Sequence, residues 1–220
     1  RNYKMKLALT SDLHGYLPDI QPCDILLIAG DICPDLRPID RQADWLDSTF
    51  RGWLEEIPAD MVVATWGNHD FIGQRGFYPT LPWTILEDEI TNIGGVSIYG
   101  SPWTPEFCNW AFMKPDEALA RVWAEIPSNL DILMVHGPPY GCCDMTVGGE
   151  RCGSKSLVKR LNELEDTGEA PKLLVCGHIH EGRGSKKVGS SWIYNVAFVD
   201  ERYQPRPEGV VYIEWEEFTK

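Results

Sequence analysis

The feature that most constrains the fold is the recurrence of short apolar runs that stop at Gly, Asp or His. Eight runs have the length of a strand, and they cover residues 5–10, 24–29, 61–65, 96–99, 131–135, 172–176, 192–196 and 210–215. Several are rich in Val and Ile, which favour strands. Four of the first six are almost continuously apolar, as is typical of strands covered on both faces. The sequence therefore predicts sheets whose two faces are both buried.

Three segments between these runs have the apolar spacing of amphipathic helices, namely residues 40–57, 115–126 and 154–165. The first has one apolar stripe, which ends before Pro58 and consists of Leu46, Phe50, Trp53, Leu54 and Ile57. Pro115 suits the first turn of the second helix, and Ser154 is a suitable N-cap for the third.

The order of these elements predicts one α/β domain over residues 1–220. Helices alternate with strands early in the chain, whereas the C-terminal part reads as strands only. This order predicts a two-layer β-sandwich flanked by helices. No internal repeat, low-complexity tract or linker divides the sequence. We expect Met5 to be the natural start, with residues 1–4 as an N-terminal extension.

Charge and hydropathy exclude several kinds of partner. The formal net charge is −13, and a surface this acidic repels the nucleic-acid backbone, so we expect no binding of long DNA or RNA. No apolar run approaches the ~20 residues of a membrane span. We expect no signal peptide, because residues 1–4 lead straight into a strand-like run. The expected partner is a small molecule, bound by a monomer or a homodimer.

The cysteines predict a reducing, cytoplasmic location. There are seven of them, an odd number without the regular spacing of a disulfide framework. Cys142, Cys143 and Cys152 could form part of a zinc knot, but they lack the paired C-x-x-C spacing of such sites. Reduced thiols are the better account.

All five histidines of the chain fall where predicted strands end, and they are His14, His69, His136, His178 and His180. One histidine alone is more often a structural or surface residue than a ligand, and an Asp or Asn after a strand is common turn chemistry. However, no histidine is left over for other roles. Because loops at sheet ends can converge at one edge, this distribution favours a shared functional site.

The spacing within these loops suits metal binding. In an extended D-x-H or H-x-H segment, residues i and i+2 point the same way, so Asp12 and His14 could address one metal together. His178 and His180 could do the same. Carboxylate and imidazole donors suit Fe, Mn and Zn. A single carboxylate such as Asp31 could bridge two cations, and two metals ~3.5–4 Å apart could clamp a phosphoryl oxygen.

Five blocks in a fixed order resemble the calcineurin-like metallophosphoesterase superfamily. They are D-x-H at 12–14, G-D at 30–31, G-N-H-D at 67–70, H at 136 and G-H-x-H at 177–180. Finer detail is similar to the small MPPED-type subfamily, which is related to the class III cyclic-nucleotide phosphodiesterases. That detail lies in residues 100–112, 136–139 and 177–182.

The resemblance implies a four-layer α-β-β-α sandwich of two mixed sheets, with two metal ions at its centre. The first metal would be held by Asp12, His14 and His180. The second would be held by Asn68, His136 and His178, and Asp31 would bridge both. His69 would face the substrate and either protonate the leaving oxygen or stabilise the developing charge, with Asp70 orienting it. The metals would be two divalent or transition ions from among Mn, Fe, Zn and Ni, with Mn favoured as the active one.

These expectations together predict a phosphodiesterase that hydrolyses cyclic nucleotides or aryl phosphodiesters through attack by a metal-bound hydroxide. Three alternatives stay open at this point. The same site could serve a phosphomonoesterase or protein phosphatase, a dinuclear nuclease, or a non-catalytic metal-binding scaffold. The His69–Asp70 pair counts against the scaffold, because a purely structural site needs neither residue. The acidic charge counts against the nuclease.

Other residues carry weaker signals. Two roles are equally open for three residues: they could form a pocket wall for a base or leaving group, or they could pack the core. These residues are Trp103, Asn109 and Trp110. Arg75 and Arg183 lie near the motif blocks and could meet a phosphate, although solvated surface is the simpler interpretation. Cys33 follows Asp31 closely and is expected to be a small buried residue.

Overall fold

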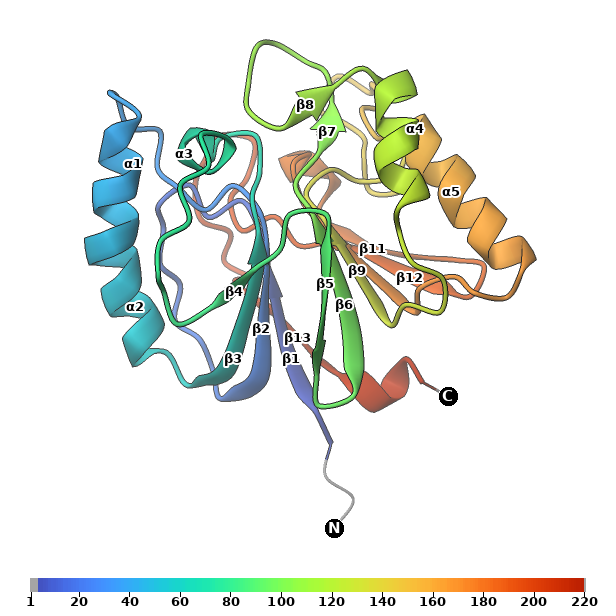
Figure 1. Ribbon diagram of the computed structural model, residues 1–220, viewed down its shortest axis with the longest axis horizontal. Coiled ribbons are helices and arrows are strands. Elements are labelled where there is room, and N and C mark those ends of the chain that lie inside the picture. The colour runs from blue at the N-terminus through green and yellow to red at the C-terminus, as the bar shows by residue number, and fades with distance from the viewer. Residues whose placement is uncertain (1–3, 220) are drawn as a thin grey trace.

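The computed structural model describes residues 4–219 and consists of two β-sheets packed face to face (Figure 1). The first sheet has the strand order β13-β1-β2-β3-β4, and the second has the order β11-β12-β10-β9-β6-β5. Helices cover the outer face of each sheet, as Figure 1 shows. The predicted four-layer α-β-β-α sandwich is therefore confirmed.

All eight predicted strands are present. In the first sheet they are β1 (Lys6–Thr10), β2 (Cys23–Ala29), β3 (Ala59–Thr65) and β13 (Val211–Glu214). In the second sheet they are β6 (Val96–Ser101), β9 (Ile132–Val135), β10 (Leu173–Cys176) and β12 (Ser191–Asn195).

The strands that sequence patterns missed are short or lie at the sheet edges. They are β4 (Thr84–Ile85), β5 (Glu89–Ile93), β7 (Thr104–Pro105), β8 (Met113–Lys114) and β11 (Gly184–Val188). All five residues of β11 are exposed. The residues of an exposed edge strand do not alternate between apolar and polar types. A search for that alternation therefore cannot detect the strand.

Both faces of the central strands are buried, which explains the continuous apolar runs. In β1, Leu7 and Leu9 pack between the two sheets, while Ala8 packs beneath the first helical layer. The same alternation recurs in β2, where every residue from Ile25 to Ala29 is at most 1% exposed. Burying each large aliphatic side chain contributes roughly 1.5–3 kcal/mol. These two strands thereby anchor the loops that follow them.

The helix predicted at residues 40–57 is continuous but contains a π-helical segment. It is built from α1 (Asp40–Trp45), η1 (Leu46–Phe50) and α2 (Arg51–Glu56). Leu46, Phe50 and Leu54 recur every four residues and are the stripe positions that are at most 5% exposed. A short helix, α3 (Phe71–Gln74), follows β3 and was not predicted.

The other two predicted helices cover the second sheet as α4 (Asp116–Ala124) and α5 (Lys155–Asp166). The Ser154 hydroxyl accepts a hydrogen bond from the Leu157 N–H at 3.1 Å, so the predicted N-cap is confirmed. Pro115 lies one residue before the expected first turn, at the N-cap position of α4.

The topology brings the functional loops to one edge. Strands β1, β2 and β3 are mutually parallel, as are β6, β9, β10 and β12. The chain leaving β12 then crosses to the end of β1. There the Ser11 N–H donates to Val196 O at 3.2 Å, and the Phe198 N–H donates to Ser11 O at 2.8 Å. Parallel strands place their carboxyl ends on the same side, so the loops of both sheets meet across this junction.

No helix within residues 4–219 is long and apolar enough to cross a membrane.

Candidate metal centre

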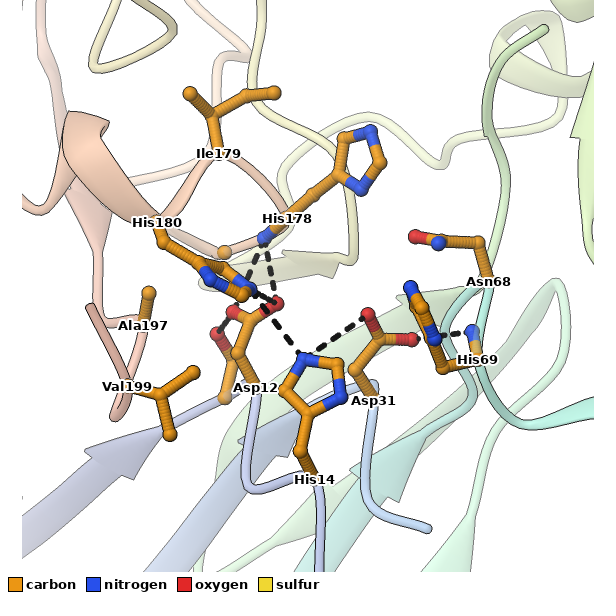
Figure 2. Close-up of polar contacts among 12 residues, drawn as sticks. Asp12, His14, Asp31, Asn68, His69, His178, Ile179, His180, Ala197 and Val199 are labelled. Atoms are coloured by element: carbon orange, nitrogen blue, oxygen red, sulfur yellow. Dashed lines mark hydrogen bonds and ion pairs between the residues drawn. The ribbon is translucent and has the colours of Figure 1, made fainter. Parts of the chain in front are cut away.

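The seven predicted metal ligands gather at the junction of the two sheets. They come from the loops after β1, β2, β3, β9 and β10, and they are Asp12, His14, Asp31, Asn68, His136, His178 and His180. Figure 2 shows the side chains of Asp12, His14, Asp31 and His180 directed toward one another. Asp12 and His136 are completely buried, and Asp31 and Asn68 are 1% exposed. We call these seven residues the floor of the site.

Four of the floor residues have a left-handed backbone. The φ angles are 52° at Asp12, 45° at His14, 53° at Asp31 and 66° at His178. A positive φ is uncommon for residues other than glycine and is costly, so it persists where the surrounding structure imposes it. Each of these residues follows a buried parallel strand closely. The strand end and the turn together direct the side chain into the junction.

Glycines beside the ligands allow the loops to approach. A Cβ on Gly30, where φ is +92°, would lie 2.6 Å from both His136 Nδ1 and Trp66 O. A Cβ on Gly177 would collide with the side chains of Ser11 and Asp12. These two positions therefore require glycine, because any side chain would occupy the space of a ligand or its neighbours.

The first group of donors joins the loops after β1 and β10. His180 Nε2 lies 3.3 Å from Asp12 Oδ1 and 3.3 Å from His14 Nε2. Donor atoms of all three residues lie within 4.8 Å of one another. The backbone N–H of His178 donates to both Asp12 oxygens, at 3.0 and 3.1 Å, and fixes the carboxylate.

The second group centres on His136. Its Nε2 atom lies 2.9 Å from Asn68 Oδ1 and 3.2 Å from Asp31 Oδ2. Its Nδ1 atom pairs with Ala29 O at 2.8 Å, which leaves Nε2 directed into the site. The His178 ring packs edge-on against His136, with 5.2 Å between the ring centroids.

Asp31 connects the two groups. The same oxygen that faces His136, Oδ2, lies 3.7 Å from His14 Nε2 in the first group. The other oxygen, Oδ1, accepts a hydrogen bond from the His69 N–H at 2.7 Å. One carboxylate is thus shared between both sets of donors.

The donor set fits divalent metal ions. Imidazoles with carboxylate and amide oxygens suit Mn, Fe, Zn and Ni, and donor atoms of Asp12, Asp31 and His136 also lie within 4.8 Å of one another. His14 Nδ1 is buried and has no hydrogen-bond partner within residues 4–219. Imidazoles and carboxylates whose donor atoms converge this closely form an arrangement that a cation would stabilise.

The protonation states of three ligands agree with this fit. Burial lowers the pKa of His14 to about 4 and that of His178 to about 3, so both imidazoles are neutral. Burial alone would raise the pKa of Asp12, but the hydrogen bond with His180 and the charges of His180 and His136 lower it to about 2. Neutral imidazole and ionised carboxylate are the forms that bind metals.

The other two histidine ligands have raised pKa values. Burial would lower the pKa of His136, but the buried carboxylates Asp31 and Asp12 raise it to about 9. Burial would also lower the pKa of His180, but Asp12 raises it. Both imidazoles would therefore release a proton to bind a cation.

A different carboxylate from the predicted one pairs with His69. The prediction was that Asp70 orients His69, but His69 Nδ1 lies 2.8 Å from Asp35 Oδ1. Asp70 instead accepts backbone hydrogen bonds of 2.8–3.2 Å from Ile32, Cys33 and Gly67. It therefore fixes the loops on either side of His69 rather than the imidazole itself. Sequence reasoning missed Asp35 because it stands in an exposed loop without any periodic pattern.

His69 and Asp70 have perturbed pKa values with identifiable causes. Burial would lower the pKa of His69, but the hydrogen bond with Asp35 and the charge of Asp31 raise it to about 8. Burial, followed by the charge of Asp31, raises the pKa of Asp70 to about 6, against the effect of its backbone hydrogen bonds.

A cavity of about 780 Å³ opens above the floor. Its lining includes Asp31, Asn68, His69, His178 and His180, together with four aromatic residues that we call the rim. The rim consists of Phe107, Trp110, Tyr140 and Tyr203. Trp110 was among the candidates from the sequence, and its ring centroid lies 5.0 Å from that of His69. No sequence pattern pointed to Tyr203, which lies in a loop outside every motif block.

The remaining weak candidates lie outside the cavity lining. Trp103 donates to Asp88 Oδ2 at 2.8 Å and packs against the core, and Asn109 is exposed. The Arg75 side chain is exposed and lies 3.4 Å from Asp40. Arg183 donates to the carbonyl oxygens of Ala197 and Gly209, at 2.7 Å each. Cys33 is buried, as expected.

All seven cysteines are free thiols. Cys142, Cys143 and Cys152 appear in none of the clusters of metal donors found in the described part of the chain.

Comparison with known proteins agrees with this fold and site. The chain belongs to the calcineurin-like phosphoesterase family, whose model matches residues 5–182. It is 30% identical over 230 residues to metallophosphoesterase domain-containing protein 1 of Homo sapiens, a match that covers 91% of this chain and 68% of the human protein. The resemblance to the MPPED-type subfamily is thereby confirmed.

Two solved structures share the fold at low sequence identity. One superposes with a TM-score of 0.61 at 15% identity, covering 98% of this chain and 96% of its own. The other is a putative 5'-nucleotidase from Staphylococcus aureus, with a TM-score of 0.52 at 12% identity. It covers 96% of this chain and 54% of the nucleotidase. At these identities the likeness concerns the fold alone.

Proposed function

We propose that this phosphoesterase hydrolyses small phosphodiesters at a centre of two divalent metal ions, with manganese as the favoured metal. The position of Asp31 carries the proposal. Its Oδ2 atom lies 3.7 Å from His14 Nε2 and 3.2 Å from His136 Nε2, so it faces a donor from each group. A carboxylate in this position suits a pair of cations better than a single one.

The residues of the chain have separate tasks in this reaction. Bound divalent ions would polarise a phosphoryl oxygen and lower the pKa of a coordinated water. Hydrolysis adds water across the P–O bond, yielding a monoester and an alcohol. His69 lies in the cavity lining with Nδ1 held by Asp35, which leaves Nε2 to donate a proton to the departing oxygen. The attacking water releases its proton to solvent, and the ring is reprotonated from solvent, so the reaction consumes no net proton at His69.

The preference for diesters rests on the scarcity of free cations near the floor. A monoester dianion usually calls for extra cationic clamping, often by Arg. Arg183 is engaged with two backbone carbonyls, and Arg75 lies against Asp40 outside the cavity lining. The metals would then supply nearly all the positive charge, which is adequate for a monoanionic diester.

One observation favours a phosphomonoesterase instead. Arg151 and Lys155 line the cavity and are its two Lys or Arg residues within the described part of the chain. Arg151 is bound to Asp144 at 2.8 Å, and Lys155 Nζ lies 5.1 Å from the centroid of the Tyr140 ring. A dianionic substrate that reached this side of the cavity would lie close to the positive charges of Arg151 and Lys155.

The decisive assay compares matched substrates on metal-stripped protein reloaded with Mn, Fe, Zn or Ni. We expect kcat/KM for bis(4-nitrophenyl) phosphate to exceed that for 4-nitrophenyl phosphate at neutral to mildly alkaline pH. A clear preference for the monoester would favour the phosphatase. Metal binding without turnover of either substrate would favour a non-catalytic scaffold, an alternative that the His69–Asp35 contact counts against.

The proposal extends to the setting of the enzyme. Seven free thiols support a reducing, cytoplasmic location. The net charge of −13 disfavours long nucleic acid as the substrate. We propose a monomer or homodimer, which sedimentation of the purified chain would decide.

A further inference from the structure

We propose that Tyr203 is a substrate-contacting residue that, with Trp110, forms a slot for a neutral, planar aromatic leaving group beside His69. This inference deepens the proposed function and depends on it. It assigns a role to a residue outside every motif block and names the chemical class of the group that departs.

Tyr203 contacts three of the five active-site imidazoles. Its ring centroid lies 4.8 Å from that of His14, 5.0 Å from that of His180 and 6.2 Å from that of His69. The residue is nevertheless 40% exposed and lines the cavity. A tyrosine that served only the core would be buried. This one presents part of its ring to the space above the floor.

The loop that carries Tyr203 is braced. The Asp200 carboxylate accepts hydrogen bonds from the N–H groups of Arg202 and Gln204, at 2.8 Å each. The Arg206 side chain donates to His180 O at 3.0 Å, and His180 Nδ1 pairs with Asp200 O at 2.9 Å. The loop is therefore tied to a floor residue at two points.

Tyr203 itself has a φ of +59° within this braced loop. A left-handed backbone is a genuine outlier for a bulky side chain and persists only where surrounding contacts impose it. The outlier and the bracing together hold the ring over the imidazoles.

The position of His69 determines which part of the substrate meets these rings. Its Nδ1 is held by Asp35, so the leaving oxygen must lie against Nε2. The Trp110 centroid is 5.0 Å from His69, and Phe107 packs edge-on against Trp110 at 5.7 Å. A substituent on the leaving oxygen therefore enters space bordered by Trp110 and Tyr203. Offset or edge-to-face contact with such rings favours a planar aromatic group.

The charges around the cavity disfavour an anionic group. Glu106, Glu181 and Glu201 line it, against two cations, Lys155 and Arg151, of which Arg151 is already bound to Asp144. An anionic substituent would be repelled by these carboxylates. A neutral aryl or heteroaryl group avoids that repulsion and gains contact with the rings.

Non-hydrolysable phosphinates test the slot separately from the reaction. In benzyl(methyl)phosphinate a CH2 replaces the leaving oxygen and carries the ring, and ethyl(methyl)phosphinate is the matched probe without a ring. Titration calorimetry on the manganese-loaded chain should show the benzyl probe binding about tenfold more tightly, the scale expected of aromatic contacts with two rings. A 4-carboxybenzyl analogue should lose most of this advantage.

Variants then assign the preference to residues. Tyr203→Leu and Trp110→Leu should each reduce the benzyl-to-ethyl ratio by at least about threefold, measured at full metal loading. Tyr203→Phe, which keeps the ring, should retain the ratio. The matched control is Tyr78→Leu, since Tyr78 is 55% exposed and lies outside the cavity lining.

The outcomes separate two failures. If wild-type protein binds both probes equally, or if Tyr203→Leu keeps the full ratio, the proposed aromatic slot is refuted. The proposed phosphodiesterase activity is unaffected by that result. If neither phosphinate binds to the metal-loaded chain, the floor is not a phosphoryl site, and both the proposed function and the slot fail.

Discussion

The floor of the site and its rim are built in opposite ways. The ligands of the floor follow buried parallel strands, and Asp12, Asp31 and His136 are at most 1% exposed. The rim comes from loops, and Phe107, Tyr140 and Tyr203 are 66%, 39% and 40% exposed. Floor residues are held by backbone turns and by each other, whereas most rim residues have one side in solvent.

This difference separates chemistry from selectivity. Rigid elements can hold reacting groups to a fraction of an ångström, which metal and proton-transfer chemistry require. Exposed loops can vary without disturbing those groups. Changes to the floor should therefore abolish turnover, while changes to the rim should alter which ester is hydrolysed.

Asp31→Asn should cause the largest loss. The substitution keeps the shape of the side chain but removes the charge that both donor groups share, so metal content should fall from two ions toward none. Turnover should drop by more than about 10³-fold, because metal ions stabilise the transition state by several kcal/mol. Elemental analysis and steady-state kinetics measure both quantities. Asp47→Asn, at an exposed position on the first helix, is the control. Retention of both ions and normal turnover would exclude the bridging role.

His69→Ala should keep both metals but lower turnover by roughly 10²–10⁴, the usual range for a general acid. The loss should be smaller for a nitrophenolate leaving group than for an alkoxide, because nitrophenolate departs with less protonation. Equal losses for the two leaving groups would mean that His69 only positions the substrate.

Removing the metals should destabilise the fold. Ions that bind only the native state raise the free energy of unfolding by roughly 4 kcal/mol when their concentration is about 1,000 times the dissociation constant. The midpoint of thermal unfolding should accordingly rise when stripped protein is reloaded with manganese, and the rise should be small in Asp31→Asn. An unchanged midpoint in wild-type protein would contradict a metal centre built into the floor.

Asp35 and Asp70 should have separable effects. Asp35→Asn weakens the partner of His69 at a half-exposed site, so turnover should fall by about 10–100-fold with little change in stability, by analogy with other carboxylate–imidazole pairs. Asp70→Asn disturbs a buried carboxylate that accepts several backbone hydrogen bonds, and it should lower the free energy of unfolding by about 2–4 kcal/mol. Chemical denaturation of both variants measures the free energy of unfolding, and steady-state kinetics measure turnover. The reverse pattern would restore Asp70 as the residue that orients His69.

Arg75→Ala should produce the smallest effect. Its side chain is exposed, lies 3.4 Å from Asp40 and is absent from the cavity lining. Solvent-exposed ion pairs contribute about 0–1 kcal/mol, so the free energy of unfolding should change by at most about 1 kcal/mol. Because Arg75 lies outside the cavity lining, kcat/KM for diesters should change by less than about twofold. A large loss of kcat/KM would place a phosphate contact on this side of the floor.

Much of the floor could be predicted without coordinates, because its signals are local. Apolar runs reveal buried strands, and the polar residues directly after them are Asp12, His14, Asp31, Asn68 and the later histidines. Their types indicate a metal centre, and their order carries the family resemblance. Parallel strands then bring residues such as His14 and His180, 166 positions apart, to the same edge.

The side chains that complete the site become evident only in the folded chain. Asp35 reaches His69 from a loop 34 residues away, and Tyr203 is presented by a braced turn that no periodic pattern marks. Asp70 stands next to His69 in the sequence, yet its carboxylate is directed toward the amides of a different loop. Hydrophobic periodicity and residue type are local properties, so the buried central strands and the donor chemistry could be predicted from the sequence, whereas several short or edge strands could not. The direction of a loop side chain depends on contacts between distant segments, and those exist only once the two sheets have packed together.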